Sequence, residues 1–101
     1  MQAVKAAVVV DSNEYTRDEL RLALYEHTGY RLEAKRFYPW LPYCLIRKKA
    51  LYTERDLAKL VFVAQFIQRV RSLELARDAL IQDIKQNPQK YPYPEEMPNA
   101  N

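Results

Sequence analysis

The spacing of apolar residues along the chain predicts four helices. They cover residues 17–27, 31–38, 53–70 and 72–85. In the third helix Leu57, Leu60 and Ala64 recur every three or four positions, which places them on one face. Valines and a phenylalanine widen that face, so we expect this helix to lie at the centre of the core.

The ends of these helices carry capping signals. Thr16 precedes the first helix and has Glu19 three residues later, which is the pattern of a capping box. Gly29 follows the same helix and is expected to take the left-handed conformation that ends it. Pro39 and the proline after it are expected to end the second helix, because proline has no N–H to donate. Ser72 is the expected cap of the fourth helix.

Three short apolar runs predict strands. Residues 6–10 contain three consecutive valines and are followed by turn-forming residues. Residues 43–46 and 50–52 flank Lys48 and Lys49, and predict a hairpin with a basic tip. The first strand needs a partner for its backbone groups, and this hairpin is the other candidate in the sequence. We therefore expect a mainly α protein with a small, three-stranded β-sheet.

The chain has 101 residues, which corresponds to one domain. We expect an N-terminal strand and turn in residues 1–14 and a helical domain in residues 15–86. Residues 87–101 contain four of the six prolines and are expected to form an extended or disordered tail. Tyr91 and Tyr93 are the side chains expected to rest on the body of the protein.

The composition argues against most enzyme and cofactor classes. A single glycine cannot build a loop that cradles phosphates, which needs several glycines. Cys44 and His27 are the sole cysteine and histidine, too few for an internal disulfide, a structural zinc site or an oriented catalytic pair. We expect no enzyme activity, cofactor or metal, and interpret Cys44 as a small buried apolar residue. With no targeting or membrane segment predicted, the expected location is a reducing cytoplasm.

Positive charge is concentrated in residues 31–49. This stretch holds six basic residues and one acidic residue. Its net positive charge therefore exceeds the net charge of +3 of the whole chain. The basic residues are Arg31, Lys35, Arg36, Arg47, Lys48 and Lys49. Aromatic residues lie among them, and such a combination is typical of a surface that meets phosphates. A solvated basic face is the alternative interpretation.

Two stretches resemble the DNA-binding domain of the MerR family. Residues 52–76, YTERDLAKLVFVAQFIQRVRSLELA, are similar to the family pattern Y-[ST]-x-x-D-L-x-x-L-x-F-I followed by S-L-E. Residues 28–38, TGYRLEAKRFY, match the pattern T-G-V-S-x-x-T-L-R-Y-Y more loosely. The resemblance covers about residues 15–81. It implies a winged helix-turn-helix fold with four helices, a hairpin wing and an N-terminal strand.

The sequence also departs from the family pattern. The first helix is longer by about one turn. Ala50 stands where the wing of the family has an arginine, and Pro39 shortens the second helix. The long dimerisation helix and the effector domain of the family have no counterpart in the sequence, so we expect no sensing function.

The resemblance implies that the chain binds duplex DNA as a small transcription regulator or architectural factor, acting as a homodimer or homo-oligomer. Helix 31–38 would enter the major groove and the wing at residues 47–49 would reach flanking phosphates. The residues so implied are Arg31, Lys35, Arg36, Tyr38, Arg47, Lys48 and Lys49. For Tyr38, packing in the core is an equally weighted alternative, and Trp40 and Tyr43 are expected to pack in the protein rather than stack on bases.

Two other functions stay open at this point. The fold could serve as a protein-interaction module without DNA binding, taking an acidic protein or a second copy of itself as partner. The missing wing arginine, Pro39 and the apolar N-terminal strand favour this alternative. RNA binding through the same positive surface is a third, weaker hypothesis.

Overall fold

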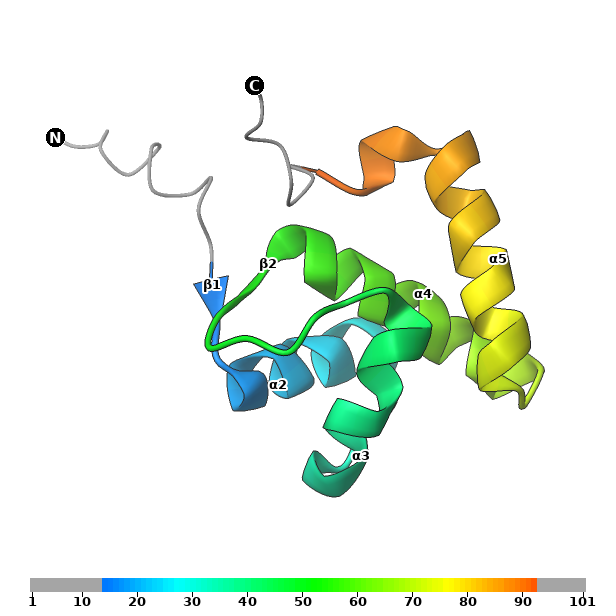
Figure 1. Ribbon diagram of the computed structural model, residues 1–101. Helices are drawn as coiled ribbons and strands as arrows, with labels where there is room; N and C mark the ends of the chain where they lie inside the picture. The colour runs from blue at the N-terminus through cyan, green and yellow to red at the C-terminus, as the bar shows by residue number, and fades with distance from the viewer. Residues whose placement is uncertain (1–13, 93–101) are drawn as a thin grey trace, which may run out of the picture.

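The computed structural model describes residues 14–92. Four helices make up most of this part of the chain (Figure 1). They are α2 (Arg17–Thr28), α3 (Ala34–Trp40), α4 (Glu54–Arg69) and α5 (Leu73–Gln86). The expectation of a mainly α protein with a small sheet is confirmed.

The sheet consists of two short strands, β1 (Glu14–Tyr15) and β2 (Tyr52–Thr53). They pair antiparallel, with Glu14 opposite Thr53 and Tyr15 opposite Tyr52. The predicted three-stranded sheet is therefore wrong for residues 14–92, where the sheet has two strands. The predicted strand at residues 6–10 lies outside the described residues.

Helix α4 forms the centre of the core, as its apolar spacing predicts. It packs against α2, α5 and β2, and Leu57, Leu60, Val63 and Ala64 on its inner face are buried. Leu20 and Leu24 from α2 and Leu80 from α5 are also buried in the same core. The core thus joins elements from both halves of the described chain.

Each predicted cap is present. Thr16 and Glu19 form both hydrogen bonds of the capping box, at 3.2 and 2.9 Å, and the Ser72 hydroxyl accepts from the backbone N–H of Leu75 at 3.2 Å. Gly29 has a φ of 77°, in the left-handed region that favours glycine. These local signals place the ends of α2 and the start of α5 correctly.

Helix α3 differs from its prediction at both ends. It begins at Ala34 rather than at residue 31, because residues 29–33 run non-helically and the Arg21 side chain donates a 2.8 Å bond to the Leu32 carbonyl. It also continues through Pro39 to Trp40. An interior proline costs about 3 kcal/mol. Burial of Phe37 and Trp40 by the same turns stabilises by about 3–6 kcal/mol together, which offsets that cost.

The predicted hairpin is wrong. Residues Leu41–Cys44 form a 3₁₀ helix, η1, and residues 45–51 form a loop that leads into β2. Cys44 is buried as expected, but within this 3₁₀ helix and not within a strand. The predicted tip contains no glycine or asparagine to adopt the positive φ values of a tight hairpin turn.

After α5, residues 88–91 pack on the body of the protein. Pro88–Lys90 form a second 3₁₀ helix, η2, and Tyr91 is buried. The Tyr91 hydroxyl donates to Asp83 at 2.5 Å, and Arg55 donates to the Tyr91 carbonyl at 2.8 Å. The expectation of an extended or disordered tail from residue 87 is wrong as far as Tyr91, whereas packing of Tyr91 on the body is confirmed. Tyr93 lies outside the described residues.

Tyr15 predicts a loss of stability at alkaline pH. Its hydroxyl donates to Glu54 at 2.7 Å; burial, this hydrogen bond and the charge of Glu54 raise the pKa of Tyr15 from 10.0 to about 12. Since the folded state holds the proton more tightly, this stabilisation is present below pH 10 and is lost as the pH rises towards 12. In urea unfolding across this range, the stability difference between wild type and Tyr15→Phe should narrow. A stability difference that stays the same between pH 10 and pH 12 would contradict the assignment to the Tyr15–Glu54 bond.

None of the helices in residues 14–92 has the length and apolar character needed to cross a membrane.

Candidate nucleic-acid interface

Helix α3 presents an exposed outer face. Its inner face carries the buried side chains of Phe37 and Trp40. Successive residues of a helix are rotated by about 100° around its axis, so the positions between these two point outward. Lys35 and Tyr38 are three residues apart and are neighbours on this outer face. Both are exposed, which makes Tyr38 a surface residue rather than a core aromatic.

Tyr38 is the point at which three separate segments meet. The Nζ atom of Lys48, from the loop 45–51, lies 4.7 Å from the centre of the Tyr38 ring. The guanidinium carbon of Arg17, at the start of α2, lies 5.9 Å from the same centre. A cation over an aromatic face is attracted by the ring quadrupole, by about 0.5–1 kcal/mol at an exposed site. The ring thus holds two cations beside α3.

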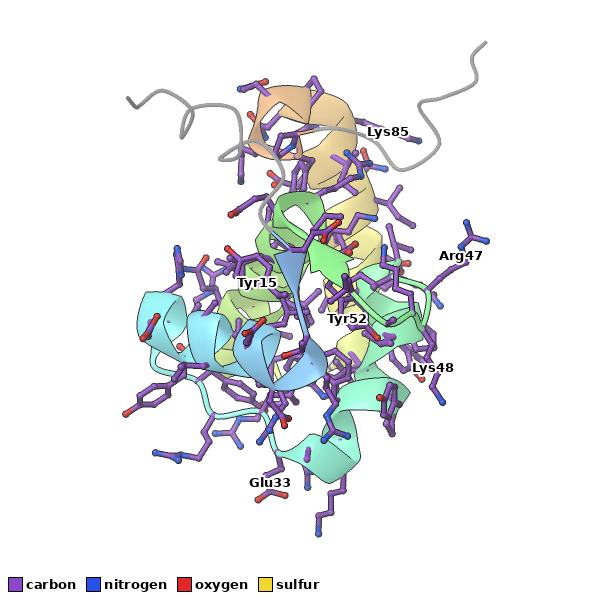
Figure 2. All side chains as sticks on the ribbon, turned by 90° about the vertical axis from the view of Figure 1, so that its left-hand side faces the viewer. Tyr15, Glu33, Arg47, Lys48, Tyr52 and Lys85 are labelled. Atoms are coloured by element: carbon purple, nitrogen blue, oxygen red, sulfur yellow. The ribbon has the colours of Figure 1, made fainter. Side chains whose placement is uncertain are left out.

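Arg47 extends this cluster along the loop. It is exposed, and Figure 2 shows Arg47 and Lys48 on the same side of the protein. We call Arg17, Lys35, Tyr38, Arg47 and Lys48 the Tyr38 patch. It brings together four of the seven residues that the sequence predicts for DNA contact.

Lys49 serves a different purpose from its neighbour. Its Nζ atom lies 2.9 Å from the Oδ2 atom of Asp56, a carboxylate that is fully buried. The backbone N–H of Lys49 also donates to the Tyr52 hydroxyl at 3.2 Å. Lys49 therefore anchors the loop to α4, and its charge is directed inward.

A second lysine fixes the other end of the loop. Lys59 is buried in α4, and its Nζ atom donates to the carbonyl of Leu45 at 2.8 Å. Leu45 has a φ of 57°, a conformation that is unfavourable for a residue with a side chain. This hydrogen bond satisfies the carbonyl at the turn, and the two lysines together hold Arg47 and Lys48 beside α3.

Arg31 and Arg36, two other predicted contacts, lie away from the patch. Arg31 precedes α3 and its guanidinium carbon stacks 5.0 Å from the centre of the Tyr25 ring. Arg36 lies two positions before Tyr38, and two helical positions are about 160° apart around the axis. It borders a separate hollow together with Arg71. The six predicted cations therefore do not share one face.

Arg17 is a residue of the patch that the sequence interpretation missed. It lies in the first turn of α2, outside the basic stretch 31–49, and forms an ion pair with Asp18 at 3.1 Å. The hydrogen bonds from Arg17 and Arg21 hold the pKa of Asp18 below its ordinary value. Nothing local in the sequence signals the approach of Arg17 to Tyr38, which depends on the packing of α2 beside α3.

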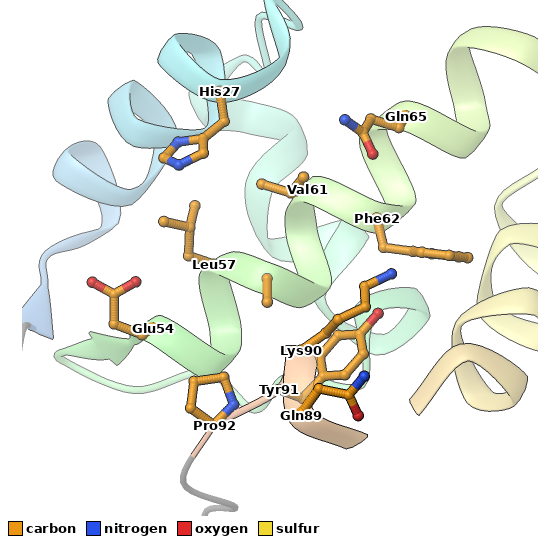
Figure 3. Close-up of a pocket in the computed structure, with 11 residues that line it drawn as sticks. His27, Glu54, Leu57, Val61, Phe62, Gln65, Gln89, Lys90, Tyr91 and Pro92 are labelled. Atoms are coloured by element: carbon orange, nitrogen blue, oxygen red, sulfur yellow. The ribbon is translucent and has the colours of Figure 1, made fainter. Parts of the chain in front are cut away.

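An apolar hollow lies on another side of the protein. Figure 3 shows it between His27 at the end of α2, the side chains of α4 and the segment 89–92. Its volume is about 460 Å³, and Leu57, Val61 and Phe62 form an apolar floor. His27 is held at its rim, where Nδ1–H donates to the Ala23 carbonyl at 2.9 Å.

The described residues hold few groups suited to catalysis or metal binding. Burial raises the pKa of the Cys44 thiol far above its ordinary value, so this group stays protonated and unreactive. Within residues 14–92 no three histidine, cysteine, aspartate or glutamate side chains gather to hold a metal ion. The Tyr38 patch is therefore the candidate site that the contacts between described residues support best.

Comparisons with known proteins found no matching family model, no matching curated protein and no matching solved structure. The resemblance to the MerR family thus stays a prediction from the quoted residues.

Proposed function

We propose that the protein binds duplex DNA through the Tyr38 patch. In this proposal the outer face of α3, with Lys35, meets the major groove, and the loop residues Arg47 and Lys48 meet a flanking phosphate backbone. Arg17 adds a fourth cation at the start of α2. The observation that carries the proposal is the convergence of Lys48 and Arg17 on the Tyr38 ring, which gives α3 and the loop a common surface.

The rigidity of the loop supports this proposal. Lys49 and Lys59 fix it at two points to groups on or beside α4, so Arg47 and Lys48 are held in place before a ligand arrives. Less conformational entropy is then lost on binding. The order of the helices, two before the basic loop and two after it, is the order that the MerR resemblance implies, but a loop takes the place of the implied hairpin wing.

The four cations set the expected dependence on salt. Each phosphate neutralised on duplex DNA contributes about −0.9 to the slope of log K against log salt concentration. Four cations then give a slope of about −3 to −4. The six cations of the sequence interpretation would give about −5, so the slope separates the two arrangements.

Replacing Arg47 and Lys48 with glutamine should weaken DNA binding about tenfold or more and make the salt slope about two units shallower, because two phosphate contacts are lost. Fluorescence anisotropy with a labelled duplex of mixed sequence measures both quantities. Circular dichroism and urea unfolding establish that the variant folds like wild type. An unlabelled RNA duplex as competitor tests the RNA hypothesis, which predicts stronger competition by RNA than by DNA.

Arg69→Gln/Lys85→Gln provides the matched control. Both residues are exposed and lie in the last turns of α4 and α5. Their replacement removes two positive charges, as does the replacement of Arg47 and Lys48. This variant should keep the affinity and slope of wild type. If the two double variants weaken binding equally, the patch is not the DNA site and only general charge matters.

A second candidate function, protein interaction, is favoured by the position of Arg36. This residue faces away from the Tyr38 patch and borders a hollow with an apolar lining. A basic rim around an apolar hollow suits a protein segment that combines acidic and apolar side chains.

A further inference from the structure

The hollow bordered by Arg36 lies where α3 meets the corner between α4 and α5. Its volume is about 260 Å³, and it is lined by Tyr30, Arg36, Trp40, Ile67, Arg71 and Leu73. The rings of Tyr30 and Trp40 stack at 5.3 Å and give it an aromatic wall. Next to it along the chain, Val70 and Leu75 remain 42% and 52% exposed.

The two charged side chains that line this hollow are both positive. Arg36 and Arg71 are both exposed, and within residues 14–92 neither guanidinium forms an ion pair or a hydrogen bond. Ser72 caps α5 directly after Arg71, so the positive end of that helix dipole is close by. Two guanidinium groups beside an apolar lining are suited to a ligand that has carboxylates next to a large apolar side chain.

The chain itself contains such a segment. Glu95, Glu96 and Met97 are consecutive and follow a proline. We propose that these three residues of one copy bind the Arg36–Arg71 hollow of a second copy, with the carboxylates on the arginines and the methionine on the apolar lining. This proposal deepens the second candidate function by naming the partner, and it does not depend on DNA binding.

The fixed position of Tyr91 favours a second copy over the same molecule. Arg55, in the first turn of α4, binds the Tyr91 carbonyl, whereas Ile67 of the hollow lies twelve residues further along this helix, about 18 Å away. The six residues from Tyr91 to Met97 span at most about 20–22 Å, so the segment would reach the hollow of its own molecule only when almost fully extended. Figure 1 likewise shows the end of α5 and η2 at one end of the molecule and α3 at the other.

The contact joins two different surfaces, so it is heterologous. Each copy offers one hollow and one acidic segment, and further copies can add at either end. The average mass in solution should therefore increase with protein concentration, and it should decrease at high salt because the contact is between opposite charges.

Charge reversal on each side tests the contact. Light scattering should show self-association of wild type, and at least about tenfold weaker association of Arg36→Glu/Arg71→Glu and of Glu95→Lys/Glu96→Lys. An equimolar mixture of these two variants should associate again, since glutamates in one hollow now match lysines in the other segment. The unchanged acidic segment of the first variant also matches the unchanged arginines of the second, so the two variants should alternate and the average mass of the mixture should rise with concentration, whereas each variant alone stays monomeric.

Several results would overturn the proposal. They are a wild type that stays monomeric at all concentrations, variants that associate like wild type, and a mixture that stays monomeric although both variants fold. Trp40 is the only tryptophan and lines the hollow, so its fluorescence reports occupancy. A change in that fluorescence between dilute monomeric wild type and Glu95→Lys/Glu96→Lys would show that the segment binds within one molecule, which contradicts the second copy.

These measurements contain no DNA, so their failure is separate from failure of the proposed function. Self-association without any loss of DNA affinity in Arg47→Gln/Lys48→Gln would refute the DNA site alone. A monomeric wild type that binds DNA through Arg47 and Lys48 would refute the self-association alone.

Discussion

Replacing Asp56 with alanine is expected to lower the free energy of unfolding by about 3–5 kcal/mol, because it removes a fully buried carboxylate from its ion pair with Lys49. Asp56 is fully buried in the first turn of α4 and lies 2.9 Å from Lys49. A domain of this size has a total stability of about 5–15 kcal/mol. The loss is therefore a large fraction of the whole, and urea unfolding followed by circular dichroism measures it.

Three contacts explain why this one carboxylate matters. It accepts a 2.9 Å bond from the backbone N–H of Thr53, while the Asp56 N–H donates to the Thr53 hydroxyl at 3.3 Å. These two bonds cap α4, and the ion pair with Lys49 fixes the loop. Removing the carboxylate loses the bond from the Thr53 N–H, leaves the Thr53 hydroxyl to cap α4 alone, and releases the segment that carries Arg47 and Lys48. DNA binding should therefore weaken along with stability.

Asp18→Ala provides the matched control for Asp56→Ala. Asp18 also lies in the first turn of a helix and pairs with Arg17 and Arg21, but its side chain is 64% exposed. Exposed ion pairs are screened by water and contribute little to stability, so the loss should be much smaller than that of Asp56→Ala. Similar losses for the two variants would mean that the burial of Asp56 has no special consequence.

The helices of this protein could be predicted because their signals are local. Thr16 and Ser72 bond backbone groups three residues away, and Gly29 acts through its own φ angle. Apolar spacing in α4 likewise needs no knowledge of distant residues. Such signals depend only on the sequence within one or two turns, so the bounds of α2, α4 and α5 follow from them.

The loop 45–51 could not be predicted, because its contacts are distant in sequence. Leu45 takes a left-handed conformation that depends on Lys59, fourteen residues away. In the sequence, Lys48 and Lys49 are equivalent neighbours at a predicted tip. In the structure one contacts Tyr38 on the surface and the other pairs with the buried Asp56. Only the packing of the loop on α4 distinguishes them.

The candidate site was predicted in part for a similar reason. The choice of α3 and the basic loop followed from composition, and four of the seven predicted residues gather in the Tyr38 patch. The predicted start of α3 was three residues too early, which wrongly placed Arg31 on the helix. The side of α3 on which Arg36 lies depends on how the helix is rotated to bury Phe37 and Trp40, and the sequence does not reveal this rotation.

Replacing Phe37 with alanine is expected to cost about 3–5 kcal/mol, the range for large aromatic residues in a core. Phe37 lies on the inner face of α3, and its side chain is fully buried. Its ring makes edge contacts with Tyr38 at 5.2 Å and with Tyr52 at 5.4 Å. Aromatic pairs of this kind contribute about 0.5–1.5 kcal/mol beyond burial, so the variant should lie at the upper part of the range.

In Phe37→Ala, α3 should unfold before the rest of the protein. This helix has seven residues, whereas isolated helices shorter than about 12–15 residues are marginal in water. Without Phe37, Trp40 is the remaining buried aromatic side chain that holds it. In urea, the fluorescence of Trp40 should therefore change at lower concentrations than the circular dichroism of the whole protein, and DNA affinity should fall with the fluorescence signal.

Phe66→Ala separates burial from the mere loss of a phenyl ring. Phe66 lies on α4, is only half-buried and stacks on Phe62 at 6.3 Å. Because less apolar surface is involved, its replacement should cost about 1–2 kcal/mol and leave fluorescence and circular dichroism with one common transition. If Phe37→Ala also unfolds in one common transition, α3 is not an independent weak point, and the patch it carries is as stable as the core.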